Sequence, residues 1–170
     1  MKRVLMLASV ASMIDQFNMP NIALLQKLGY QVDVACNFIE GNTCSDARVA
    51  ELKQKLQNMH VRCYQIDFAR NIKHMGQNMK ALWQVEGLMK QNTYAFCHCH
   101  SPIGGVVARI AGHRTRTKVI YTAHGFHFYQ GAPVMNWLVY YPVEKVLSRW
   151  TDVLITINHE DYKLAKKKLK

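Results

Sequence analysis

Long apolar stretches, abundant proline or glycine, and a regular cysteine pattern are all missing from this sequence. It contains no run of about 18 uncharged apolar residues, so we expect no helix that crosses a bilayer. Four prolines and nine glycines among 170 residues exclude a low-complexity or collagen-like chain. Apolar residues make up 49% and charged residues 19%, which is enough to build the core of one ordinary domain.

The five cysteines form no recognisable disulfide pattern. They stand at positions 36, 44, 63, 97 and 99, an odd number at irregular spacing. Free thiols of this kind favour a reducing cytoplasm. The run Cys97-His98-Cys99-His100 is rich in metal-binding residue types, but on a strand its cysteines and histidines point to opposite faces. We therefore predict no metal site, with His98 buried at a strand end and His100 emerging at the rim.

Glycine is also absent from residues 9–17, which follow the first predicted strand. A loop that cradles the phosphates of a dinucleotide or of ATP needs several glycines there. We therefore predict no nicotinamide or Walker-type site and no cofactor. Asp15 remains as a polar side chain for a substrate contact, whereas Asn18 is typical of a helix cap.

Negative charge is scarce. Only 11 acidic residues stand against 22 lysines and arginines, which gives a net charge of +11. Such an excess favours an anionic partner: phosphate groups, nucleic acid or an acidic membrane surface. Part of it lies in a C-terminal tail, and the rest does not alternate with aromatic residues as in a nucleic-acid surface, so we expect no nucleic-acid partner. Glu144 is expected to form an ordinary surface ion pair with a neighbouring Lys or Arg.

Short buried strands alternate with helices along the whole chain. The predicted strands span 4–8, 31–36, 61–66, 94–99, 118–123 and 153–157, and the predicted helices span 18–29, 46–56, 72–90, 102–111, 136–150 and a last one from 158. This alternation predicts an α/β fold, a Rossmann-like, doubly wound parallel sheet with helices on both faces. The first strand has a rival interpretation, since the basic start Met1-Lys2-Arg3, the apolar run at 4–10 and the small residues at 8–12 also resemble a short signal peptide.

The segment after the fifth predicted strand carries the strongest candidate residues. In such sheets ligands bind beyond the carboxyl ends of the strands. There, the ring of His124 can accept a hydrogen bond from a sugar hydroxyl, act as a base or contact a phosphate. Gly125 lets a ligand approach the backbone, and Phe126 and His127 are candidate substrate contacts. The alternative is an aromatic loop that only covers the end of the sheet.

A second candidate segment joins the fourth predicted strand to the next helix. A helix N-terminus with small residues can hold an anion through its free backbone N–H groups. We therefore expect His100, Ser101, Gly104 and Gly105 to line the cleft. An equally weighted alternative is that the two glycines allow tight packing of the helix on the sheet.

Together these segments resemble a known family. The runs that carry the resemblance are YTAHGFHFYQGAP at 121–133, NW at 136–137 and YYPVEK at 140–145, together with DQFNMPN at 15–21, HCHSPIGG at 98–105 and TDVLITIN at 151–158. In these runs the chain resembles the N-terminal domain of bacterial family 4 glycosyltransferases, and within them the enzymes that make capsular and extracellular polysaccharide. The resemblance covers nearly the whole chain, and the His-Gly-Phe-His-Phe run is its most specific part.

The resemblance implies one half of a GT-B fold, in which two Rossmann-like halves face each other across a cleft. Residues 1–170 would be the N-terminal, acceptor-side half, with a C-terminal donor domain absent from this chain. The implied reaction is retaining and needs no metal. It moves a sugar from a nucleotide-sugar, bound mainly by the missing domain, to a lipid-linked saccharide in surface polysaccharide synthesis. The first loop of many members is glycine-rich, and this chain departs from that pattern.

By position, the family's histidine near the reacting sugar is His124, which we expect to be catalytic. Asp15 and His127 would contact the acceptor. The whole protein is then expected to be a cytoplasmic glycosyltransferase, peripheral at the inner face of the cell membrane and attracted to its anionic surface, while this chain alone is expected to be inactive. The alternative is a stand-alone, non-catalytic subunit that recruits a transferase to the membrane.

Overall fold

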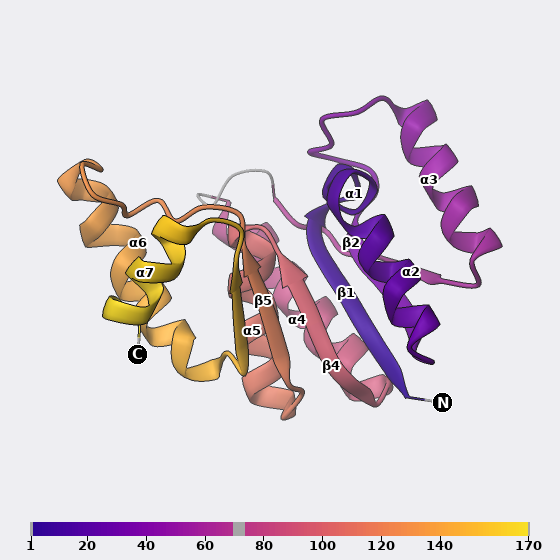
Figure 1. The fold of residues 1–170 in the computed structure, drawn as a ribbon. Helices are drawn as coiled ribbons and strands as arrows, with labels where there is room; N and C mark the ends of the chain where they lie inside the picture. The colour runs from indigo at the N-terminus through magenta and orange to yellow at the C-terminus, as the bar shows by residue number, and fades with distance from the viewer. Residues whose placement is uncertain (1, 70–73, 170) are drawn as a thin grey trace.

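Six parallel strands and the helices between them build the fold in the computed structural model, which describes residues 2–69 and 74–169 (Figure 1). The strands are β1 (Arg3–Val10), β2 (Gln31–Asn37), β3 (Arg62–Gln65), β4 (Tyr94–His100), β5 (Val119–Ala123) and β6 (Val153–Thr156). The helices are α1 (Ala11–Met13), the π-helix η1 (Ile14–Asn18), α2 (Met19–Lys27), α3 (Asp46–Asn58), α4 (Met75–Gln91), α5 (Pro102–Thr115), α6 (Val134–Leu147), the 3-10 helix η2 (Ser148–Trp150) and α7 (His159–Lys168).

The order of the strands is β3-β2-β1-β4-β5-β6, and every neighbouring pair is parallel. This is the order of a doubly wound Rossmann sheet, in which the direction of winding reverses between β1 and β4. The predicted fold class is therefore confirmed. The reversal point also fixes where to look for a site, because the loops at the carboxyl ends of β1 and β4 diverge there.

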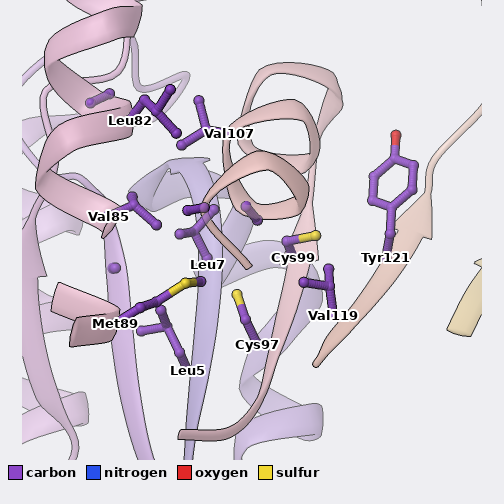
Figure 2. Packing of buried hydrophobic residues seen from close by; sticks show 14 of the residues in the cluster. Leu5, Leu7, Leu82, Val85, Met89, Cys97, Cys99, Val107, Val119 and Tyr121 are labelled. Atoms are coloured by element: carbon purple, nitrogen blue, oxygen red, sulfur yellow. The ribbon is translucent and has the colours of Figure 1, made fainter. Parts of the chain in front are cut away.

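The first strand is a central strand of the sheet, buried on both faces. Leu5 and Leu7 belong to a core shared with α4 and α5, whereas Val4 and Met6 belong to a second core shared with α2 and α3. Figure 2 shows the first of these cores, where Leu5 and Leu7 face side chains of α4. A continuous apolar run is what such doubly covered parallel strands require, and the strand interpretation of residues 4–8 is confirmed.

The alternation predicted for the Cys-His run is also confirmed. Cys97 and Cys99 are fully buried in the core beneath α5 (Figure 2), and all five cysteines are free. His98 and His100 occupy the alternate positions and so project from the other face of β4. The two sulfurs and the two imidazoles therefore cannot meet around one metal ion.

Several predicted elements differ in extent, and the segments at 9–17 and 72–90 are two of them. Residues 9–17 were expected to form a loop, but 11–18 are helical, because Ala11 and Ile14 are buried against β1 and β2 and the Asn18 side chain donates to the carbonyl of Met13 at 3.1 Å. The helix predicted over 72–90 is α4, which begins at Met75. The predicted start at 72–73 lies outside the described residues.

Glu144 does not form a surface ion pair, and this expectation is wrong. Its two carboxylate oxygens accept hydrogen bonds from both terminal nitrogens of Arg109 at 2.6 and 2.9 Å. Arg109 is only 1% exposed, and its Nε donates to the carbonyl of Gly105. The pair joins α5 to α6 inside the molecule, and 35 residues separate the partners, so neighbouring charges in the sequence did not reveal it.

Candidate active site

The carboxyl ends of β1, β4 and β5 meet where the winding of the sheet reverses. Ser101, directly after β4, connects them: its Oγ accepts hydrogen bonds from the backbone N–H of Ser9, at the end of β1, and of Gly104, in the first turn of α5, both at 3.3 Å. His124 directly follows β5. The candidate segments after the first, fourth and fifth strands are thus brought to one edge of the sheet, which is the usual ligand site of this architecture.

His124 is half-buried at this edge, between β4 and the helical segment after β1. Its Nε2 lies 3.1 Å from Nδ1 of His100, and its ring centroid lies 5.3 Å from that of Phe17. Among the described residues its Nδ1 has no hydrogen-bond partner. One nitrogen of His124 is therefore held by the protein, and the other is available to a ligand.

His100 lies deeper than predicted. It is 2% exposed, whereas His98 is partly exposed, so the expectation that His98 is buried and His100 emerges at the rim is reversed. The reason is that β4 extends to residue 100, one residue beyond the predicted end, and His124 then lies against its last side chain. His98 is held by a 2.8 Å hydrogen bond between its Nε2 and Oγ1 of Thr122, and the rings of His98 and His100 are 4.4 Å apart.

The three histidines are neutral at physiological pH. Burial, reinforced by the neighbouring imidazoles, lowers the pKa of His100 to about 3 and that of His98 to about 4. Burial also lowers the pKa of His124 below its usual value. A neutral imidazole donates one hydrogen bond and accepts one. A neutral His124 can therefore orient a polar ligand atom through a hydrogen bond from its unengaged nitrogen.

The two glycines after Ser101 serve packing. A Cβ at Gly105 would lie 2.5 Å from the Tyr121 ring, and one at Gly104 would lie 2.9 Å from Oγ of Ser101. Their N–H groups are engaged by Oγ and O of Ser101, respectively. The free N–H groups that the anion-binding interpretation requires are thus occupied at both positions, and the packing alternative fits better.

Ser101 itself has an unusual backbone. Its φ of 67° and ψ of 154° belong to a region that is nearly reserved for glycine, and such strain is found at functional sites. With its Oγ bound to two backbone N–H groups, the side chain fixes the turn between β4 and α5. We infer that Ser101 shapes the site and holds His100 in place.

Asp15 is turned towards α3. Its carboxylate accepts hydrogen bonds from Nε and Nη2 of Arg48 at 2.7 and 3.2 Å. The ion pair neutralises the side chain and fixes η1 against α3. The expected contact between Asp15 and an acceptor stays a prediction, to be made in competition with Arg48.

The segment after His124 divides its side chains between the core and the surface. Phe126 and Phe128 are buried and stack on each other at 4.9 Å, while His127 is exposed and stacks on Tyr140 of α6 at 4.5 Å. Gly125 has a φ of 129°, a conformation that side chains rarely adopt. The aromatic loop thus covers the end of the sheet. It also bounds an apolar pocket of about 90 Å³ between α5 and α6, which Phe126 and His127 help to line.

Sequence reasoning missed Phe17 as a site residue. Its ring is 51% exposed although it is a large aromatic side chain, and it lies beside His124. Phe17 belongs to the run at 15–21, but only the π-helix sets the direction of its ring, and π-helices are frequent at functional sites. An exposed aromatic ring next to a neutral imidazole is a suitable surface for the apolar face of a sugar.

Within residues 2–69 and 74–169, no three side chains of His, Cys, Asp or Glu are grouped so as to hold a metal ion. No helix in these ranges has both the length and the apolar character needed to cross a membrane.

Comparisons with known proteins agree on the family to which this chain is related. The model of the glycosyl transferase 4-like domain matches residues 19–165. The EpsD protein of Bacillus subtilis (strain 168), a glycosyltransferase by provisional assignment, is 40% identical over 168 residues, which are 97% of this chain and 40% of EpsD. An uncharacterised 41.2 kDa protein from the cps region of Klebsiella pneumoniae is 30% identical over 82 residues, 45% of this chain and 23% of that protein.

Solved structures share the fold at low sequence identity. MurG of Acinetobacter baumannii superimposes with a TM-score of 0.58 at 19% identity, over 92% of this chain and 41% of MurG. HepE of Anabaena, solved with UDP and glucose, superimposes with a TM-score of 0.59 at 15% identity, over 91% of this chain and 37% of HepE. The chain spans about 40% of the length of EpsD. It belongs to the glycosyl transferase 4-like domain family and folds as one half of the GT-B architecture.

Proposed function

We propose that this chain is the acceptor-side half of a glycosyltransferase. The whole protein would move a sugar from a nucleotide-sugar to a lipid-linked saccharide in surface polysaccharide synthesis. The observation that carries the proposal is the position of His124, which presents an unengaged nitrogen at the switch point of a GT-B half-domain. The origin of one relative in a cps region supports the polysaccharide pathway.

The binding of the nucleotide-sugar donor is the second part of the proposal. HepE, which shares the fold, was solved with UDP and glucose. In the present chain, residues 11–18 form α1 and η1 and contain no glycine, so the glycine-rich first loop of many family members has no counterpart there. We therefore propose that the nucleotide-sugar is bound mainly by a second domain. The proposed transfer is retaining and independent of metal, as the family resemblance implies.

The membrane partner is proposed on the basis of α6. One side of this helix exposes six large apolar side chains: Val134, Met135, Leu138, Val139, Val143 and Val146. Arg149 follows on η2 and lines a pocket of about 390 Å³ together with Arg116 and Lys118. An apolar helix face bordered by cations is the pattern of a helix that lies in an anionic membrane interface.

The orientation of α6 relates this surface to the candidate site. The helix begins directly after the loop at 124–133, and the ring of its Tyr140 stacks on the ring of His127. A lipid that lies along α6 would therefore place its head group near His127 and His124. This arrangement supports a lipid-linked acceptor bound at a membrane surface.

The experiment that tests the proposed function is sugar transfer by the whole protein. Membranes from the source cells supply acceptor lipid, a panel of radiolabelled nucleotide-sugars supplies donors, and label is counted in the organic extract. We expect one donor to label the lipid fraction and residues 1–170 alone to give no label. The proposal fails if the whole protein labels no lipid with any donor, or if residues 1–170 suffice.

The second candidate is a stand-alone subunit that recruits a transferase to the membrane. The exposed face of α6 favours it, because such a subunit needs a membrane surface and no donor site. The intact mass of the protein from its source cells distinguishes the two. A mass of about twice 19.6 kDa supports the two-domain enzyme, and a mass near 19.6 kDa supports the subunit.

A further inference from the structure

The hydrogen bond between His100 and His124 needs one donor and one acceptor, and the surroundings of the two rings indicate which is which. The two nitrogens, Nδ1 of His100 and Nε2 of His124, are 3.1 Å apart, which is a hydrogen bond between two imidazoles. One of the two nitrogens must carry a proton and the other must accept it. Because each neutral ring has a single N–H group, this choice also decides which nitrogen of His124 is protonated.

The environment of His100 favours one direction. Its ring is 2% exposed, and its Nε2 is buried with no partner among the described residues. If His124 donated the proton, the neutral His100 would carry its own proton on Nε2, as a buried N–H group without an acceptor. If His100 donates, Nε2 is an unpaired acceptor instead. Orphaned buried N–H groups are rarer in proteins than unsatisfied acceptors, so donation by His100 is favoured.

Both rings are held in the neutral state that this argument requires. The lowered pKa values of His98 and His100 keep these rings uncharged well below neutral pH. After burial, the ionisable groups that act on His100 are His98 and His124 themselves. Among the described residues, β4, β5 and η1 bring no carboxylate into hydrogen-bond contact with the three imidazoles. Nothing there stabilises an imidazolium.

We propose that His100 is a positioning residue whose Nδ1–H donates to Nε2 of His124, so that His124 carries its own proton on Nδ1, the nitrogen available to a ligand. An unrestrained neutral imidazole prefers the proton on Nε2, so the contact selects the less common tautomer. His124 then meets a ligand as a hydrogen-bond donor rather than as a base.

The consequence for catalysis rests on the proposed function. A donor at this position suits an oxygen that gains negative charge, such as a sugar or phosphate oxygen at the reacting centre. The backbone around Ser101 supports this role, because its two hydrogen bonds fix the residue that follows His100. His100 therefore acts through His124 and not by contact with substrate, in contrast to the expectation from sequence.

The tautomer is measured by nitrogen NMR of the histidine side chains in the 170-residue chain, with no substrate present. We expect His124 to show a pyrrole-like shift at Nδ1 and a pyridine-like shift at Nε2 at pH 7. The opposite pattern in the wild-type protein overturns the proposal, whatever the variants do. Because the measurement needs no donor or acceptor, its failure is separate from a failure of the proposed transfer activity.

Two variants test the dependence on His100. His100→Leu removes the donor, and we expect the proton of His124 to shift towards Nε2. His100→Asn places an amide N–H near the former Nδ1, and we expect it to keep the wild-type pattern. His113→Gln, on the exposed end of α5, is the matched control and should leave His124 unchanged. A wild-type pattern in a folded His100→Leu variant contradicts the proposal.

Discussion

The guanidinium of Arg109 lies 4.1 Å from the centroid of the Tyr121 ring. A single aromatic residue of β5 thus covers both the buried cation of α5 and the backbone of Gly105. The ion pair between Arg109 and Glu144 then connects α6 to the same residues. The helices on either side of the apolar pocket near His127 are therefore positioned by one small group of side chains.

Glu144→Gln should strongly destabilise the protein, because it leaves the charge of Arg109 buried without a counter-charge. Removing one partner of a buried pair typically costs about 3–5 kcal/mol. The free energy of unfolding in urea measures the effect. Glu86→Gln, which affects exposed pairs with Lys90 and Arg114, is the matched control and should cause a much smaller loss. Equal losses in the two variants would show that burial of Arg109 is not decisive.

Gly105→Ala should also destabilise the protein, because the added Cβ would lie 2.5 Å from the Tyr121 ring. We expect a loss of about 1–3 kcal/mol, typical of overpacking. Gly87→Ala, inside α4 with no atom within 4 Å of the new Cβ, should instead stabilise by about 0.5–1 kcal/mol. If Gly105→Ala is as stable as the wild type, Gly105 is not a packing residue and the anion-binding interpretation returns.

The stability of the protein should fall as the pH is lowered from 7 towards 5. His98 and His100 have folded-state pKa values of about 4 and 3, below the ordinary value of 6.5, so only the unfolded chain takes up their protons in this range. Each of these two residues then lowers the free energy of unfolding by up to about 1.4 kcal/mol for every pH unit below 6.5. The measurement is urea unfolding at several pH values. The free energy of unfolding of the His98→Gln variant should depend less steeply on pH, because the contribution of one histidine is removed. A slope that is the same in wild type and variant would refute the burial argument.

The apolar face of α6 should determine binding to anionic vesicles. The combined variant Met135→Ser, Leu138→Ser and Val146→Ser should bind at least about tenfold more weakly in sedimentation, because about 1.4 kcal/mol of lost burial suffices for that factor. The control carries Leu24→Ser, Leu28→Ser and Ile39→Ser, which are also exposed but lie on other elements. Equal binding by both variants, or no wild-type binding at low salt, removes the membrane partner.

The fold follows from short-range rules, and the sequence predicts it well. The apolar run at 4–8 indicates a doubly covered strand, and the period of two separates Cys97 and Cys99 from the histidines between them. Both are properties of the backbone and need no knowledge of distant residues. The same rules place His124 just beyond a buried strand, at the edge where ligands bind.

The details of the site depend on long-range contacts that no local pattern contains. The burial of His100 depends on one additional strand residue and on the approach of His124, 24 residues away. The pairing of Glu144 with Arg109 and the direction of Phe17 likewise arise from packing between elements. The positions of these groups relative to one another were therefore beyond what spacing and residue type predict.

The central claim is that His124 acts at the reacting centre, and kinetics of the whole protein test it most directly. His124→Ala is compared with the wild type in the lipid-labelling assay, with unfolding curves as a check of the fold. We expect kcat/KM to fall by about 100-fold or more, as for the loss of a group that stabilises the transition state. A folded variant with unchanged kcat/KM would contradict the account and move the active site away from His124.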